Sequence, residues 1–391
     1  MALLAVGHTP LLLLVGSTDM PRMHVDFETF RASAVALLHG SDIYDAGAVL
    51  HNLNPPVLAV LFAPFGLLDP VVGYRILVGI TALIAVGCVF ATARELGIGR
   101  WWGGMALLAL LASSPLHGTV LLGQIYGLLL LGVTAGWIAE RRGYPRLAAV
   151  LYGLTVAVKP SLAPLLLLPA VQRRWPEFRA GLLGATASTL VGLAAAGVAS
   201  GPHWLRMVLA EPVATIPDNA SLPGLAIRFG LPSVVGTVVG GLLVVGTLWW
   251  FRTRTRRFGV DAARGTDPAG TAPWAVLATG LLAAPISWHN YLILLWPGLL
   301  LVVASGRQGD ARRAVVAALF ALATIPVSYA DLWPPGNPVS AVALALYSAI
   351  LMATWLTLLR PSVGPWVPVT GAVPGSGPFF RSAEVAARPP A

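Results

Sequence analysis

The sequence of 391 residues is strongly apolar and carries a basic balance of charge. Hydrophobic residues make up 57% and charged residues 10%, the mean hydropathy is +0.77, and apolar runs repeatedly approach the ~20 residues that cross a bilayer. This composition leaves no soluble domain of useful size and predicts an all-α, polytopic integral membrane protein. Cys88 is the only cysteine, which excludes an intramolecular disulfide and a cysteine-based metal site.

The net charge of +9 comes from arginines that stand in short clusters between apolar runs. This pattern orients membrane helices, with the clusters on the cytoplasmic side, and it does not indicate a nucleic-acid partner. The intervening loops are therefore expected to face outward. The clusters are Arg94 with Arg100, Arg141 with Arg142 and Arg146, Arg173 with Arg174 and Arg179, the arginines of residues 252–264, and Arg307 with Arg312 and Arg313.

The chain begins with a short apolar run at residues 2–16 that lacks a charged leader and a small-residue cleavage site, so we expect an uncleaved anchor. An outward loop at 17–54 follows. Within it, apolar residues at helical spacing predict a short helix in the membrane interface, namely Phe30, Ala34, Leu37 and Leu38. The next runs, 55–68 and 71–93, cannot both cross without violating the arginine rule, so one of them is expected to be partial.

Further along, runs at 101–113 and 124–139 are expected to be joined outside by a loop at 115–118. Two half-length runs, 147–158 and 162–171, flank Lys159 and Pro160, which places Lys159 at depth or at the outer face. The remaining predicted spans are 180–199, 231–251, 272–286, 291–304, 314–330 and 339–359, with an outward loop at 200–230. The total is roughly eleven to thirteen segments.

This pattern predicts one polytopic domain over residues 1–360. Residues 361–391, rich in Pro, Gly and Ser, are expected to form a disordered cytoplasmic tail.

The first outward loop gathers acidic residues in a chain that has only 16 of them. They are Asp19, Asp26, Glu28, Asp42 and Asp45. A solvated loop that stays out of the bilayer would also be acidic. As a group, however, these residues favour a carboxylate that an enzyme holds at a membrane face.

Other polar residues are expected at the same outer face, each with a functional and a structural interpretation. A lysine within the membrane, Lys159, either binds an anion or extends its ammonium to the interface. Arg228, which stands outside against the sorting rule, either binds phosphate or solvates its loop. Gln124 can cap a helix, and His289 can be a packing residue at a helix break.

Several short motifs occur in the order found in the membrane glycosyltransferases of family 87, which the chain resembles. They are Asp26-Phe27 followed by Phe30, Ala32, Gly40, Asp42 and Tyr44; Asn54-Pro55-Pro56; Gly123-Gln124; Lys159; Asn219 with Ser221; and Ser287-Trp288 with Tyr291. The sequence departs from the family pattern at three positions. The family usually has an aromatic residue where Asn54 stands, an asparagine where Tyr126 stands and a histidine where Asn290 stands, which leaves His289 and Asn290 as joint candidates.

The resemblance implies a GT-C fold and an enzyme that takes a sugar from a polyprenyl-phosphate donor. It gives Asp26 the role of general base in an inverting transfer to the hydroxyl of a glycolipid or cell-envelope glycan. Lys159 and Arg228 would neutralise the leaving phosphate. His289 or Asn290 would orient the acceptor, and Gln124, Tyr44 and Asn219 complete the expected substrate-binding set.

The same resemblance implies an active site on the extracytoplasmic side of the plasma membrane, with no nucleotide, no cofactor and no obligatory metal. Mannose is the expected sugar, and arabinofuranose from the analogous donor is the alternative. Two other classes stay open. A transporter or lipid flippase would also have broken helices, but the sequence lacks repeated halves and its acids gather at one face. An assembly subunit without catalysis would tolerate changes at Asp26.

Overall fold

The computed structural model describes residues 24–257, 270–305, 315–316, 319 and 338–359. The predicted anchor at 2–16, the tail at 361–391, Asp19 and most of the run at 314–330 lie outside these residues. The elements of the described part are helices, in agreement with the predicted all-α class. They are α3 (Val25–Leu38), α4 (Val57–Gly66), α5 (Pro70–Glu95), α6 (Arg100–Leu111), α7 (Ser114–Leu122), α8 (Tyr126–Arg141), α9 (Pro145–Val158), η1 (Pro160–Leu162), α10 (Pro164–Val171), α11 (Trp175–Ala196), α12 (Ser200–Ala210), α13 (Leu222–Arg228), α14 (Ser233–Arg257), α15 (Ala272–Ala283), η2 (His289–Leu295), α16 (Trp296–Ser305) and α18 (Pro338–Leu359).

Helix length separates full spans from partial ones. Within the described residues, α5, α11 and α14 are long and apolar enough to cross a membrane, and α6 with α7 forms a further candidate that is bent by 51°. Helix α4 has 10 residues and is therefore only about 15 Å long, half the thickness of a hydrocarbon core. The expectation that one of the runs 55–68 and 71–93 is partial is confirmed. The eleven to thirteen crossings stay a prediction.

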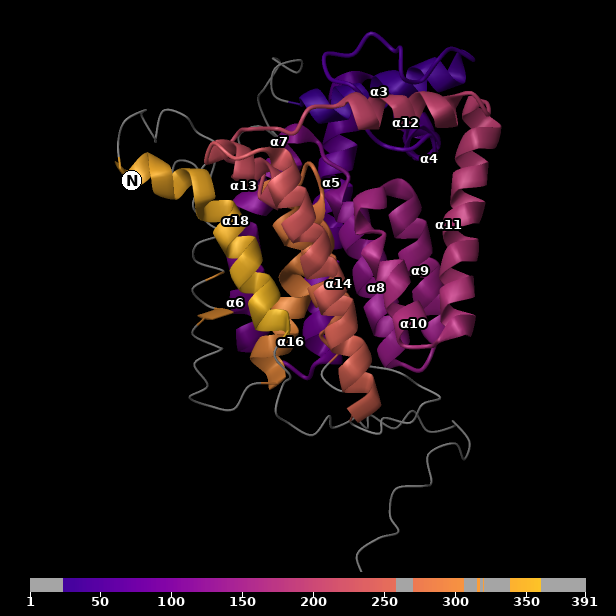
Figure 1. Cartoon of the computed structure of the whole chain (residues 1–391). Coiled ribbons are helices and arrows are strands. Elements are labelled where there is room, and N and C mark those ends of the chain that lie inside the picture. Colours follow the sequence, from indigo (N-terminus) through magenta and orange to yellow (C-terminus); the bar gives the residue numbers. More distant parts are fainter. Residues whose placement is uncertain (1–23, 258–269, 306–314, 317–318, 320–337, 360–391) are drawn as a thin grey trace, which may run out of the picture.

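The long helices run side by side, and α3 and α12 lie across one end of the bundle (Figure 1). At the opposite end, ion pairs join the ends of α5, α8 and α11. Arg142 donates to Glu95 at 3.0 Å and Arg174 to Glu140 at 2.6 Å. Two of the arginine clusters thus lie at the end of the bundle away from α3, which we call the arginine end.

Two stretches that the sequence predicted as loops are helical. Residues 115–118 lie inside α7, and the predicted loop at 200–230 contains α12 and α13. The prolines misled the prediction, because Pro115 and Pro223 occupy the first turn of their helices, where proline starts a helix instead of breaking it. The side chains of Ser113 and Ser221 cap these two helices by accepting bonds from Leu116 N and Gly224 N.

The break at Lys159 is present as predicted. Helix α9 ends at Val158, Lys159 has extended backbone, and the chain resumes as η1 and α10. The predicted helix in the first loop is also present, although α3 begins at Val25 and thus includes Asp26. Of the apolar residues that predicted it, Phe30 and Ala34 are buried, whereas Leu38 is exposed.

Candidate active site

Asp26 lies in the first turn of α3, and its neighbours in the sequence fix that turn to the end of α7. His24, at the N-cap position of α3, is fully buried, and its Nδ1 is 2.9 Å from the carbonyl oxygen of Leu121. The His24 ring stacks on Tyr74 at 3.5 Å between centroids, and the Tyr74 hydroxyl donates to Val120 O. The backbone on both sides of Asp26 is therefore held by packing.

On the other side of Asp26, Phe27 packs against Gly123, the residue that ends α7. Gly123 has a φ of +68°, which favours glycine, and a Cβ there would come within 2.5 Å of Phe27 Cβ. Only glycine therefore lets α3 approach this turn. The approach brings Asp26 to Gln124, whose side chain hydrogen-bonds to the Asp26 carboxylate.

The carboxylate of Asp26 is electrostatically suited to accept a proton. Burial raises the pKa of Asp26 to about 6, while the hydrogen bond from Gln124 and the charge of Lys159 act in the opposite direction. Helix α3 is not among the candidate spans, so the group lies at the edge of the bundle. A carboxylate with a pKa near 6 is ionised at neutral pH and is more basic than an ordinary aspartate.

Lys159 reaches the same place from the break after α9. Its Nζ donates to Asn54 Oδ1 at 3.0 Å and lies 5.7 Å from the centroid of the Tyr291 ring. Both contacts stabilise a cation, the second through the ring face. Residues from α3, from the loop before α4 and from η2 thus meet around one ammonium group.

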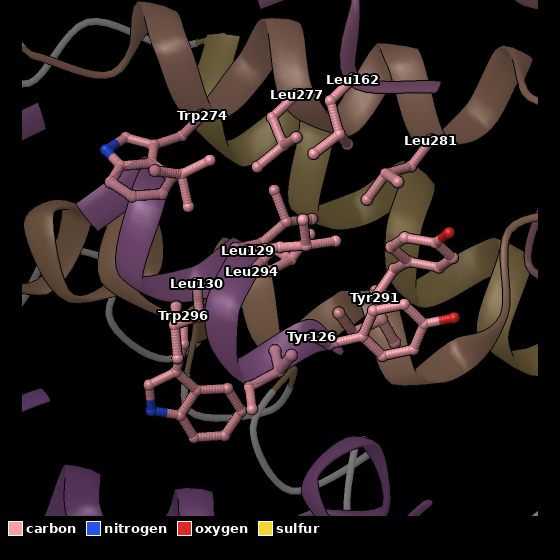
Figure 2. Close-up of a cluster of buried hydrophobic side chains, with 14 of the residues drawn as sticks. Tyr126, Leu129, Leu130, Leu162, Trp274, Leu277, Leu281, Tyr291, Leu294 and Trp296 are labelled. Carbon is pink, nitrogen blue, oxygen red and sulfur yellow. The ribbon is translucent and has the colours of Figure 1, made fainter. Parts of the chain in front are cut away.

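Two tyrosine rings form the apolar side of this site. Tyr126, at the start of α8, and Tyr291, in η2, have ring centroids 4.2 Å apart. Figure 2 shows the two rings beside a cluster of leucines from several helices, with both hydroxyls pointing away from that cluster. Tyr126 also lies close enough to Asp26 for the two groups to interact electrostatically.

An apolar cavity of about 400 Å³ lies between α9, α11, α12 and the start of α4. Its lining includes Pro55, Pro56 and Pro160, the residues that directly follow Asn54 and Lys159 in the sequence. Asn54 and Lys159 themselves are not part of the lining.

His289 and Asn290 begin η2 beneath α7, and both are buried. The His289 ring stacks on Tyr347 at 4.7 Å, and its Nδ1 lies 3.6 Å from Asp218. Burial raises the pKa of Asp218 to about 6, while the charge of Arg228 acts in the opposite direction. The amide nitrogen and oxygen of Asn290 have no hydrogen-bond partner within the described part of the chain.

Asn219 is a hydrogen-bonding centre for the loops around His289. Its amide nitrogen donates to Ala214 O and Pro285 O, and its oxygen accepts from Ser221 N and Ser287 N. These four bonds use the whole hydrogen-bonding capacity of the amide. The Asn219 side chain therefore holds two loops together and has none left for a substrate.

Arg228 likewise binds other parts of the protein. Its Nε donates to Leu344 O at 2.7 Å, and its terminal nitrogens donate to Ile216 O and Ser348 Oγ. It thereby ties α13 to α18. The acidic group that acts on Arg228 by charge is Asp218.

Tyr44 supports the first loop from below. It is buried, and its hydroxyl donates to the carbonyl oxygen of Asn54 at 2.9 Å. Eight site residues were predicted from the sequence. The structure brings Asp26, Gln124 and Lys159 together, and Tyr44 contacts Asn54, the hydrogen-bond partner of Lys159. The others form a second group around His289.

Three residues that the structure places in these two polar groups were not predicted as site residues from the sequence. Tyr126 was noted only as a departure from the family pattern, and Asn52, which bonds to Asn54, carried no signal at all. Asp218 was one polar residue among several in its loop. Their roles depend on contacts between distant segments, which no local pattern reveals.

The chain is similar in sequence to several known glycosyltransferases. The chain is 26% identical to a polyprenol-phosphate-mannose-dependent alpha-(1-2)-phosphatidylinositol mannoside mannosyltransferase of Mycolicibacterium smegmatis, over 76% of this chain and 74% of that protein. It is 25% identical to the enzyme of the same name from Mycobacterium tuberculosis, over 82% and 76%. It is also 28% identical to an alpha-(1->3)-arabinofuranosyltransferase of Mycolicibacterium smegmatis, over 88% and 74%.

The family model of glycosyltransferase family 87 matches residues 52–266, which include Lys159, Gln124 and the loop that carries Asn219. Because this match covers more than half of the chain, the protein belongs to glycosyltransferase family 87 and is a membrane glycosyltransferase.

Proposed function

We propose that the protein transfers mannose from a polyprenyl-phosphate donor to a glycolipid or cell-envelope glycan at the extracytoplasmic face of the plasma membrane. One observation carries the proposal. A carboxylate with a raised pKa, Asp26, shares a polar cluster with the ammonium of Lys159, and the residues that directly follow Asn54 and Lys159 in the sequence line an apolar cavity of about 400 Å³. The cluster provides a base and a cation, and the cavity suits the lipid part of the donor.

In the proposed reaction an ionised Asp26 oxygen takes the proton from the acceptor hydroxyl. The hydroxyl oxygen forms a bond to the anomeric carbon, and the bond from that carbon to the phosphate oxygen breaks with inversion. The polyprenyl phosphate leaves with the bonding electrons. Gln124 holds the Asp26 carboxylate toward the acceptor through its hydrogen bond.

Lys159 neutralises the leaving phosphate in this proposal. An ammonium has three donors, and the structure gives one of them to Asn54. The other two can bind phosphate oxygens as negative charge develops there, which stabilises the transition state. The first isoprene units of the donor lie in the cavity beside Pro55, Pro56 and Pro160.

The acceptor is assigned to the second polar group. Asn290 has a buried amide with no partner within the described residues, and His289 and Asp218 stand next to it. Amides and imidazoles bind sugar hydroxyls as donors and acceptors. Asn219, Arg228 and Tyr44 hold the loops of both groups in place.

The side of the membrane is proposed from the arginine clusters. Arg142 and Arg174 lie at the arginine end, whereas Asp26, Gln124 and Asn54 are tied to α3 and α7 at the other. Basic residues favour the cytoplasm, so the polar cluster faces outward. A polyprenyl-phosphate sugar is a donor that can be used there without a nucleotide.

The choice of sugar rests on the relatives. The mannosyltransferases named above favour mannose, and the arabinofuranosyltransferase, matched over 88% of this chain, makes arabinofuranose the second candidate. Membrane glycosyl transfer, rather than lipid transport, is therefore the activity to measure.

The test uses membranes that contain the protein, phosphatidylinositol mannoside as acceptor, and two radiolabelled donors assayed in parallel, polyprenyl-phosphate mannose and polyprenyl-phosphate arabinofuranose. We expect labelled glycolipid with the mannose donor. The matched control is Asp26→Asn, which keeps size and hydrogen bonding and should lower transfer by at least about 100-fold. If only the arabinofuranose donor gives labelled product, the donor sugar is arabinofuranose and not mannose. If Asp26→Asn keeps its activity, Asp26 is not the general base.

A further inference from the structure

Three buried polar side chains connect α3 to Lys159. Asn52 Nδ2 donates to Ser33 Oγ at 3.0 Å, Asn54 Nδ2 donates to Asn52 Oδ1 at 3.1 Å, and Lys159 Nζ donates to Asn54 Oδ1 at 3.0 Å. All three relay residues are less than 5% exposed. We call Ser33, Asn52 and Asn54 the amide relay.

The hydrogen bonds fix the direction of each amide. The backbone N–H of Asn54 donates to Asn52 at 3.1 Å, so the atom of Asn52 that it meets must be the carbonyl oxygen. That oxygen also meets the Asn54 side chain, which therefore presents its NH₂ group to Asn52. The Asn54 oxygen is left to face Lys159, and a flipped amide would place two donors against each other.

The relay links the base to the cation. Ser33 lies seven residues after Asp26, about two turns along the same face of α3. The relay therefore joins α3, which carries Asp26, to the loop whose Asn54 contacts Lys159. Tyr291 contacts Lys159 on another side through its ring, at 5.7 Å.

Asn54, the hydrogen-bond partner of Lys159, is uncharged. Within the described residues no ion pair involves Lys159, and the carboxylate that acts on it by charge is Asp26. An amide oxygen orients an ammonium without neutralising it. The full charge then remains available for an anion.

We propose that Asn54 is a positioning residue that aims the Lys159 ammonium at the donor phosphate without neutralising it. This inference rests on the proposed function of Lys159 as the phosphate-binding cation. It predicts that Asn54 sets the affinity for the donor and has no effect on the affinity for the acceptor.

The experiment is a double-mutant cycle on the purified full-length protein in lipid nanodiscs, with Asn54→Ala, Lys159→Met and the double variant. Donor KM, acceptor KM and kcat are measured for each. Asn54→Ala should raise the donor KM at least about tenfold, the factor expected from the loss of one hydrogen bond to a charged group, and leave the acceptor KM unchanged. In the Lys159→Met background the same substitution should change the donor KM less than twofold.

A second variant, Asn54→Asp, keeps the volume and places a carboxylate against the ammonium. The ion pair competes with the phosphate, so the donor KM should rise at least as much as in Asn54→Ala. Thr357→Val is the matched control, because Thr357 is a buried residue whose hydroxyl bonds only within α18, to Ala353 O. Its donor KM should stay unchanged.

The outcomes separate the two proposals. If Lys159→Met leaves donor KM and kcat unchanged, Lys159 does not bind the donor, and both the proposed function of Lys159 and the inference fail. If Lys159→Met impairs donor use but Asn54→Ala and Asn54→Asp do not, only the inference fails. Equal effects of Asn54→Ala with and without Lys159 would also overturn it, because Asn54 would then act independently of the lysine.

Discussion

Asp26 owes its basicity to a balance of three influences at one carboxylate. Burial raises its pKa to about 6, and Gln124 and Lys159 limit the increase. Without these two partners the pKa of Asp26 would be higher still. Gln124 and Lys159 therefore have a second task beside binding, which is to keep the base ionised.

This balance predicts the pH dependence of transfer. Asp26 must be ionised to act, so kcat/KM should be flat above pH 7 and should fall about tenfold per unit below pH 6. In Gln124→Ala the hydrogen bond that lowers the pKa of Asp26 is lost, so the acid limb should move to higher pH. The measurement is kcat/KM from pH 5 to 8.5.

The control for this shift is Gln172→Ala. Gln172 is equally buried but lies at the arginine end beside Arg174, so the acid limb should keep its position. An acid limb that stays in place in Gln124→Ala would mean that another group controls the profile.

At the same scale, the sequence predicted residues better than it predicted their contacts. Lys159 was identified because a charge within an apolar run requires a reason. Asp26 was identified from the acidic residues gathered in its loop, and both Asp26 and Gln124 belong to motifs of the family that the chain resembles. Asn54 was noted in a family motif, where it departs from the usual aromatic residue, and no role was predicted for it, yet it is the hydrogen-bond partner of Lys159. Arg228 illustrates the converse, since its charge suggested phosphate while its nitrogens bond to α18 and to Ile216. Which partner a polar group takes depends on packing between distant segments.

Among the elements, the contact of α3 with the end of α7 is the one that positions Asp26, the proposed base. Gly123 combines a φ of +68° with a Cβ position only 2.5 Å from Phe27 Cβ. Gly143 also has a positive φ, of +84°, but has open space around it. Both positions require a positive φ, but only Gly123 also requires a side chain small enough for the close contact with α3. A comparison of substitutions at the two positions therefore distinguishes the two effects.

Alanine at these two glycines should have different effects. Gly143→Ala should lower stability by about 1 kcal/mol, from backbone strain alone. Gly123→Ala should lower it by about 1 to 3 kcal/mol more, because Phe27 must move, and it should also reduce kcat as Asp26 moves with α3. Thermal unfolding in detergent and transfer assays measure the two effects. Equal losses of stability would mean that the α3–α7 contact is loose.

Helices formed by long apolar runs were predicted from the sequence, whereas helices with a proline in their first turn were not. The runs that became α5, α9, α10, α14 and α18 were found close to their observed bounds. Helices α7, α12 and α13 were missed because a proline in a first turn resembles a loop signal in the sequence. Two of the missed helices, α7 and α12, border the polar cluster or its cavity.

At the scale of the whole molecule, the polar cluster and the arginine end lie at opposite ends of the helix bundle. The ion pairs of Arg142 and Arg174 close one end, and α3 and α12 lie across the other (Figure 1). The broken helix at Lys159 ends near α3, so a cation reaches the polar cluster without crossing the bundle. The side of the membrane that the polar cluster faces decides which sugar donors can reach it.

Cysteine labelling tests which side the polar cluster faces. In a Cys88→Ala background, Val49→Cys should react with a membrane-impermeant thiol reagent added to intact cells, because Val49 is 81% exposed in the loop that contains Asn54. Tyr144→Cys should react only after the cells are opened, since Tyr144 is 63% exposed beside Arg142 at the arginine end. Both variants retain all arginines, so the sorting signal is unchanged. Labelling of Tyr144→Cys in intact cells, with Val49→Cys protected, would place Asp26 on the cytoplasmic side, where a nucleotide sugar would become the donor to test.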